Sequence, residues 1–171
     1  TNAFGCTDTS LEETVTVNSL PVANITSSGS TTICAGDSVE LVSDPAAAYD
    51  WLQNGVSIGM TSSNYFASGA AAYQVVVTNI FGCIDTSGSI TVGVVPVPVV
   101  DLGPDTTQCA GTVTLDAGNP GAVYDWSTTD STQTIVVSIT GTYWVDVTNA
   151  FGCTTRDSID VTINSFPVEN L

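Results

Sequence analysis

Asn79-Ile80-Phe81-Gly82-Cys83 decides how this chain is organised, because nearly the same five residues occur three times. The other copies are Asn2-Ala3-Phe4-Gly5-Cys6 and Asn149-Ala150-Phe151-Gly152-Cys153, so the cysteine recurs at positions 6, 83 and 153, after 77 and then 70 residues. A repeat of this length that contains short strands is typical of tandem β-sandwiches rather than of one large fold.

Other short motifs keep the same spacing. They are Cys34-Ala35-Gly36 with Cys109-Ala110-Gly111, Tyr49-Asp50-Trp51 with Tyr124-Asp125-Trp126, and Pro21-Val22 with Pro98-Val99 and Pro167-Val168. This register predicts that residues 1–21 are the C-terminal hairpin of a preceding repeat, that 22–97 and 98–168 are complete repeats, and that 169–171 start the next one. We therefore expect an elongated array.

The charge of the chain argues against several functions. Its 171 residues include one Lys or Arg, 17 Asp or Glu and no histidine, for a net charge of −16. Because Arg156 is the one basic residue, no lysine or histidine is present for amine or imidazole catalysis. A surface this negative also repels nucleic acid and anionic lipid. We predict that the chain is not an enzyme, needs no cofactor and binds no nucleic acid.

Apolar and polar residues alternate in several stretches, as in Tyr143-Trp144-Val145-Asp146-Val147. Alternation places every second side chain on one face of a strand, and it predicts an all-β fold. In the first repeat we expect strands at 21–26, 38–43, 49–53, 64–67, 73–78 and 84–94, with an added edge strand at 55–60. The longest apolar run, 92–100, is shorter than the roughly 20 residues of a membrane helix. Direct membrane insertion is therefore not expected.

The order of these motifs resembles an immunoglobulin-like sandwich. Gly36-Asp37-Ser38-Val39-Glu40-Leu41 is followed by Trp51, where strand C of such a domain has its tryptophan, and by Tyr73-Gln74-Val75 on strand F. The chain departs from that pattern at the positions of the inter-sheet cysteines, which hold the residues Ser43 and Val75 in one repeat and Ala117 and Val145 in the other.

Residues 101–109, 124–128 and 141–145 also look like the immunoglobulin-like (PKD/Ig-like) repeats of large Bacteroidota surface adhesins and filament proteins. The resemblance implies export by type IX secretion and a cell-surface or extracellular location. It further implies a structural stalk segment of an adhesin or filament used in attachment, gliding or prey capture. The alternative is a glycan- or protein-binding module, in which residues 55–63 would form the binding loop.

Five cysteines without histidine or a Cys-Xaa-Xaa-Cys pair indicate disulfides in an oxidising environment. One scheme bonds Cys34 to Cys83 and Cys109 to Cys153 within the repeats. In an immunoglobulin topology, however, the cysteines of each such pair lie at opposite ends of the sandwich. The other scheme, which we favour, bonds Cys34 to Cys153 between the repeats. It leaves Cys6, Cys83 and Cys109 to partners outside the chain.

The remaining candidate residues are aromatic, acidic or hydroxylated. Trp51 and Trp126 are predicted to fill the cores, whereas Trp144 would face outward and contact a neighbouring repeat or another copy in a homo-oligomeric fibre. Asp101 and Asp105 flank a turn but lack a calcium-binding spacing, so no metal site is expected. Asp-Ser/Thr motifs like the O-glycosylation sites of Bacteroidota occur at Ser38, Thr106, Ser131 and Ser158.

Overall fold

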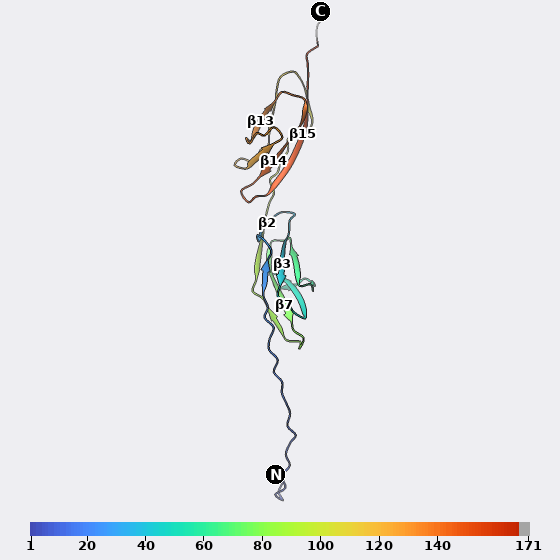
Figure 1. Cartoon of the computed structure of the whole chain (residues 1–171), viewed down its shortest axis with the longest axis vertical. Coiled ribbons are helices and arrows are strands. Elements are labelled where there is room, and N and C mark those ends of the chain that lie inside the picture. The colour runs from blue at the N-terminus through green and yellow to red at the C-terminus, as the bar shows by residue number, and fades with distance from the viewer. Residues whose placement is uncertain (168–171) are drawn as a thin grey trace, which may run out of the picture. The chain divides into compact units, whose positions relative to one another are not determined.

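The computed structural model describes residues 1–167, which form strands and no helix (Figure 1). Val168 and the start of a next repeat expected at 169–171 lie outside this part. The first nine strands are β1 (Ile25–Ser27), β2 (Thr32–Cys34), β3 (Val39–Ser43), β4 (Ala48–Gln53), β5 (Val56–Ser57), β6 (Asn64–Ala67), β7 (Ala71–Thr78), β8 (Ile84–Thr86) and β9 (Ile90–Val95). The other six are β10 (Thr106–Cys109), β11 (Val113–Asp116), β12 (Val123–Trp126), β13 (Thr134–Val137), β14 (Gly141–Thr148) and β15 (Thr154–Asn164).

The strands form two sandwiches. In the first, the sheet β1-β3-β6 accompanies the sheet β2-β9-β7-β4-β5, with β8 also paired to β7. In the second, the sheet β11-β13 accompanies the sheet β10-β15-β14-β12. This division of strands between two sheets is that of an immunoglobulin-type sandwich. The predicted all-β class is confirmed.

The alternation of apolar and polar residues along the strands produces the core of each sandwich. Along β7, Ala71, Tyr73, Val75 and Val77 are buried while the residues between them are half-buried. Trp51 and Trp126, which we expected in the cores, are 0% and 1% exposed. Their indole N–H groups donate to the carbonyl oxygens of Ser62 and Thr132, each at 2.8 Å. Each tryptophan therefore fills a core and has its one polar atom paired.

The structure differs from the predicted strands in three places. Residues 1–24 contain no strand, so only the turn of the hairpin expected at 1–21 is present. An isolated hairpin without a sheet to pack on is marginally stable at best. The strand expected at 84–94 is divided into β8 and β9, because the buried Ser87 hydroxyl accepts the Val75 N–H at 3.0 Å. Finally, β2 and β10 were not anticipated.

These additional strands are short, and each pairs parallel to the last strand of its sandwich. β2 lies beside β9 with Cys34 opposite Val95, and β10 lies beside β15 with Cys109 opposite Asn164. Each therefore brings a cysteine to the point where the last strand of the sandwich ends.

The closeness of Cα atoms in space divides the chain into two compact units. The first comprises Thr1–Thr26, Leu41–Tyr65 and Ala72–Ile90, and the second comprises Ser27–Glu40, Phe66–Ala71 and the chain from Thr91 onward. Cys34 and Cys153 thus belong to the same unit.

Among the described residues, no helix is long and apolar enough to cross a membrane.

Candidate functional site: the repeated turn and its disulfide

The turn at Asn149 is organised by its first side chain. Oδ1 of Asn149 accepts the backbone N–H groups of Phe151 at 2.9 Å and Cys153 at 3.1 Å. The backbone N–H of Asn149 donates to the Cys153 carbonyl at 3.0 Å. Gly152 has a φ of +84°, a left-handed conformation that glycine adopts without a steric penalty. These contacts hold Cys153 in one position, where it is 1% exposed.

The same hydrogen bonds occur in the other two copies. Oδ1 of Asn79 accepts the N–H groups of Phe81 and Cys83, both at 3.0 Å. Oδ1 of Asn2 accepts those of Phe4 and Cys6 at 3.0 and 3.1 Å. All of residues 1–20 are exposed and none is in a strand. The turn is therefore encoded locally, by an asparagine that bonds to the backbone two and four residues later.

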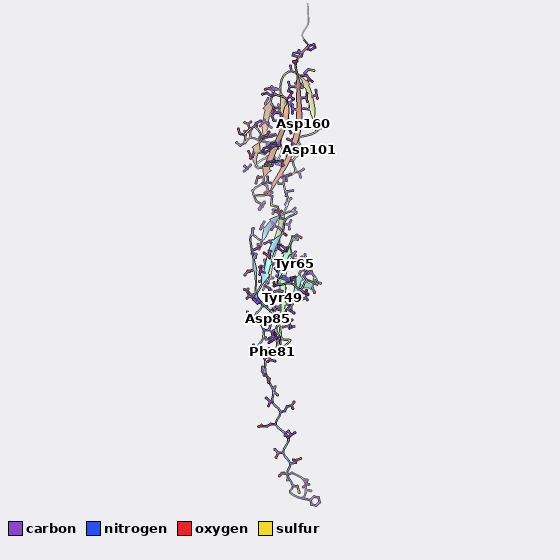
Figure 2. The ribbon with its side chains drawn as sticks, turned by 45° about the vertical axis from the view of Figure 1, so that its right-hand side comes forward. Tyr49, Tyr65, Phe81, Asp85, Asp101 and Asp160 are labelled. Atoms are coloured by element: carbon purple, nitrogen blue, oxygen red, sulfur yellow. A yellow bond between two sulfur atoms is a disulfide. The ribbon has the colours of Figure 1, made fainter. Side chains whose placement is uncertain are left out.

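The amide nitrogen of the same asparagine contacts a preceding linker. Nδ2 of Asn149 donates to the Pro96 carbonyl at 3.0 Å, and Nδ2 of Asn79 donates to the Ser19 carbonyl at 2.9 Å. A second contact in the first sandwich runs from the Ala23 N–H to Oδ2 of Asp85 at 3.1 Å, on a side chain labelled in Figure 2. In both sandwiches the turn is thus joined to the segment that leads into the repeat.

Asn149→Ala should destabilise the second sandwich. The substitution removes two accepted hydrogen bonds and one donated bond, each worth about 0.5–1.5 kcal/mol, so we expect a loss of about 2 kcal/mol. Chemical denaturation followed by tryptophan fluorescence measures it. Asn2→Ala is the matched control, since it removes the same turn contacts where no strand is formed. An equal loss in both variants would contradict the explanation.

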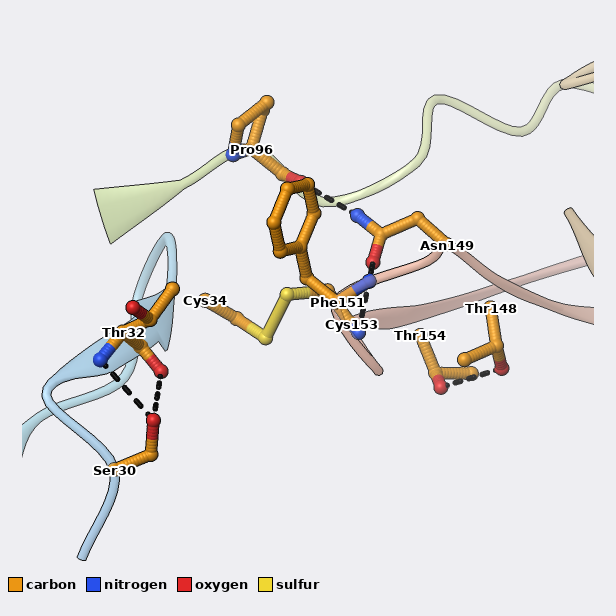
Figure 3. The surroundings of a disulfide bond; sticks show 9 residues. All are labelled: Ser30, Thr32, Cys34, Pro96, Thr148, Asn149, Phe151, Cys153 and Thr154. Atoms are coloured by element: carbon orange, nitrogen blue, oxygen red, sulfur yellow. Dashed lines mark hydrogen bonds between the residues drawn. A yellow bond between two sulfur atoms is a disulfide. The ribbon is translucent and has the colours of Figure 1, made fainter. Parts of the chain in front are cut away.

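The structure bonds Cys34 to Cys153, with their Cα atoms 5.6 Å apart (Figure 3). Of the two schemes left open by the sequence, this is the bond between repeats. The alternative pairs, Cys34 with Cys83 and Cys109 with Cys153, are not formed, and Cys6, Cys83 and Cys109 are free.

Topology favours the bond between Cys34 and Cys153 over the alternative scheme. Cys34 lies opposite Val95 at the end of β9, whereas Cys83 precedes β8 at the other end of the same sheet. At about 3.3 Å per residue, β9 alone separates those ends by roughly 20 Å, while a disulfide joins Cα atoms about 4.4–6.8 Å apart.

Cyanogen bromide offers a direct test of this bond, because Met60 is the one methionine of the chain. Cleavage after Met60 separates Cys34 from the other bonded cysteine, so the two fragments should migrate together on a non-reducing gel and separate after reduction. Cys153→Ser should release the fragments without reductant. Cys83→Ser and Cys109→Ser should leave them joined, and release in the Cys83→Ser chain would support the pairing of Cys34 with Cys83 instead.

Trp144 is covered within its own sandwich. The guanidinium carbon of Arg156 lies 3.9 Å from the centre of the Trp144 ring. Nε and Nη2 of Arg156 donate to the two carboxylate oxygens of Asp146 at 2.7 and 2.6 Å. The indole is half-buried, so the contact with another repeat or chain stays a prediction.

Acidification should weaken the ion pair between Arg156 and Asp146. The hydrogen bond from Arg156 lowers the pKa of Asp146 below its ordinary value of 3.8, and the same bond raises the pKa of Arg156. A carboxylate whose pKa is lower in the folded state stabilises the fold above its ordinary pKa. That contribution is lost as the pH falls through the lowered pKa.

Asp146→Asn should therefore lower the melting temperature at about pH 6, by a few degrees at most because exposed pairs contribute little, and should have a smaller effect near pH 2. Calorimetry at both pH values measures the difference. Asp37→Asn, an equal charge change on an exposed residue of the first sandwich, serves as the control. An Asp146→Asn effect that does not change with pH would contradict this account.

The other candidate residues are distributed over the surface. Ser38, Ser131 and Ser158 are exposed and Thr106 is half-buried, so glycosylation at these positions stays a prediction. Asp101 and Asp105 accept hydrogen bonds from the backbone N–H groups of Gly103 and Asp160. Among residues 1–167, no three Cys, Asp or Glu side chains gather in a way that could hold a metal ion.

Residues 55–63 are part of the first sandwich rather than a free loop. β5 pairs with β4, and the Ile58 N–H donates to the Trp51 carbonyl at 3.0 Å. Val56 is 68% exposed and Met60 42% exposed. The insertion is thus an added edge strand, as the sequence suggested, with two apolar side chains in solvent.

Sequence reasoning missed the role of Asn79 and Asn149. The sequence contained a signal for this role, because asparagine is the first residue of all three copies of the motif. Its side chain commonly forms hydrogen bonds with the backbone of the turn in which it lies. It also missed that Arg156 covers Trp144. Trp144 and Arg156 lie on consecutive strands joined by the Asn149 turn, and the antiparallel pairing of Asp146 with Arg156 across β14 and β15 brings the guanidinium over the indole.

No family model matches this chain, and no curated protein matches it. Among solved structures, fibronectin(III)-like modules of Clostridium thermocellum CbhA are 12% identical with a TM-score of 0.39, over 86% of this chain and 97% of that one. The insect immune protein hemolin is 17% identical with a TM-score of 0.45, over 78% and 44%. A Ca²⁺-stabilised adhesin of an Antarctic bacterium is 13% identical with a TM-score of 0.42, over 86% and 50%. Each is similar to this chain in fold only.

Proposed function

We propose that this chain is a structural stalk segment of a long extracellular adhesin or filament. The observation that carries the proposal is the bond between Cys34, at the end of a strand of the first sandwich, and Cys153, in a turn of the second. Its sequence separation of 119 residues means that most of both sandwiches lies inside one covalent loop. Tension applied to the ends of the chain would pass through the disulfide instead of through that loop.

The disulfide also supports an extracellular location, because disulfides persist in oxidising surroundings and are rare in the cytosol. The motif resemblance extends the proposal to export by type IX secretion and to attachment, gliding or prey capture.

Attachment under flow tests the proposal in cells that display the full-length protein. Cys34→Ser should leave attachment at rest unchanged and weaken it under shear, because force then unfolds the sandwiches and lengthens the stalk. The double variant Val56→Ser with Met60→Ser, in the exposed insertion, should leave attachment unchanged both at rest and under shear. Loss of attachment at rest in the insertion variant would favour the glycan- or protein-binding module instead.

A further inference from the structure

The free Cys83 lies in a turn of the same conformation as that of the bonded Cys153, and it is half-buried where Cys153 is buried. In both turns the asparagine side chain accepts the cysteine N–H, at 3.0 Å for Cys83 and 3.1 Å for Cys153. The preceding glycines have φ angles of +80° and +84°. Both asparagines also donate to the linker that leads into their repeat. Cys83 is therefore held in the conformation that forms a disulfide in the second sandwich, yet it has no partner within the described residues.

The free Cys109 corresponds in the same way to the bonded Cys34. Each is the last residue of a short strand paired parallel to the final strand of its sandwich. The next backbone N–H, of Ala35 or Ala110, donates to the final strand at 2.8 Å or 2.7 Å. A glycine with a φ of +98° or +93° follows. Cys109 is exposed and unbonded.

We infer that Cys83 and Cys109 form two further disulfides of the Cys34–Cys153 type with other immunoglobulin-like modules of the same repeat. The observed bond joins a strand-end cysteine to a turn cysteine, so Cys109 pairs with a turn cysteine and Cys83 with a strand-end cysteine. Such a contact uses two different surfaces, and contacts of that kind build rings or open arrays rather than closed dimers. The inference rests on the proposed stalk function and adds the chemical identity of its partner.

Bond formation is an ordinary thiol–disulfide exchange. A small-molecule or protein disulfide accepts the two electrons: one thiolate attacks it to form a mixed disulfide and releases one thiol. The second thiolate then displaces the other half. The products are one protein disulfide and two thiols derived from the oxidant.

Two variants of the full chain test the pairing rule, each keeping Cys34–Cys153 and lacking Cys6. Cys6→Ser with Cys109→Ser keeps only the turn thiol, and Cys6→Ser with Cys83→Ser keeps only the strand-end thiol. They are mixed in equal amounts in a buffer of reduced and oxidised glutathione. Random coupling makes the mixed dimer about half of all dimers, whereas the inference predicts at least about tenfold more mixed than like dimers. A mixed fraction near half would overturn it.

Cys6 provides a matched control, because it lies in the same turn without a sandwich. The variant Cys83→Ser with Cys109→Ser keeps this thiol, which is fully exposed where Cys83 is half-buried. It should form the mixed dimer with the Cys109 thiol more slowly than Cys83 does, despite its greater exposure. If Cys6 reacts as fast or faster, the turn alone suffices and the inferred module contact is wrong.

Protein from native cells distinguishes the two sources of partner. Non-reduced peptide mapping should find the Cys109 peptide joined to a peptide with the Asn-Xaa-Phe-Gly-Cys motif. A non-reducing gel then shows whether that motif belongs to the same polypeptide or to another copy. Cys109 as a free thiol would overturn the inference. The stalk function would survive that result if the Cys34→Ser variant still weakened attachment under shear.

Discussion

Pulled by its two ends, the oxidised chain should extend to about 180 Å, the length of the residues outside the disulfide loop, while the reduced chain should extend about 400 Å further, at about 3.5 Å per residue. The reason is the sequence separation of 119 residues between the bonded cysteines, out of 171 residues in the chain. While the bond holds, the applied force is transmitted through the disulfide, and the residues inside the loop are not stretched. Single-molecule force spectroscopy with and without a reductant measures the two lengths.

Two variants control this measurement. Cys153→Ser should show the long extension with or without reductant, because it lacks the bond. Cys109→Ser should behave like the unmodified chain, since Cys109 is free. A long extension of the oxidised, unmodified chain would mean that the bond does not carry the load, and the stalk proposal would lose its main support.

Trp126→Ala should be the most destabilising single substitution in the second sandwich. Trp126 is 1% exposed, and removal of a buried tryptophan side chain typically costs about 3–5 kcal/mol. If trypsin cuts only the unfolded sandwich, cleavage should accelerate by about 10²-fold to several thousandfold. The readout is specific to this sandwich, because Arg156 in β15 is the one basic residue and hence the one tryptic site.

Trp51→Ala is the matched control, because it opens an equivalent cavity in the first sandwich. It should lower the stability of that sandwich by a similar amount and leave the tryptic rate at Arg156 nearly unchanged. Equal acceleration by both variants would show that the two sandwiches unfold as one cooperative unit.

The alternation of apolar residues and the repeated turn motif predicted most of the fold. Positions such as Trp51 and Val75 could be placed in a core from local pattern alone, because a strand turns alternate side chains to opposite faces. The turn at Asn79 is equally local, since the hydrogen bonds that Oδ1 of Asn79 accepts span at most four residues. The strand interruption at Ser87 was not predictable, because it depends on a bond to Val75 on a neighbouring strand.

By itself, therefore, the sequence determined the all-β class, the repeat and the form of the cysteine turn, all of which depend on interactions between residues close together in the chain. Tertiary structure decided which cysteines bond. Cys34 meets Cys153 because β2 pairs parallel to β9 and brings Cys34 to the end of that strand. Pairing between strands far apart in sequence has no local signal, since the backbone hydrogen bonds that create it are the same for every residue type.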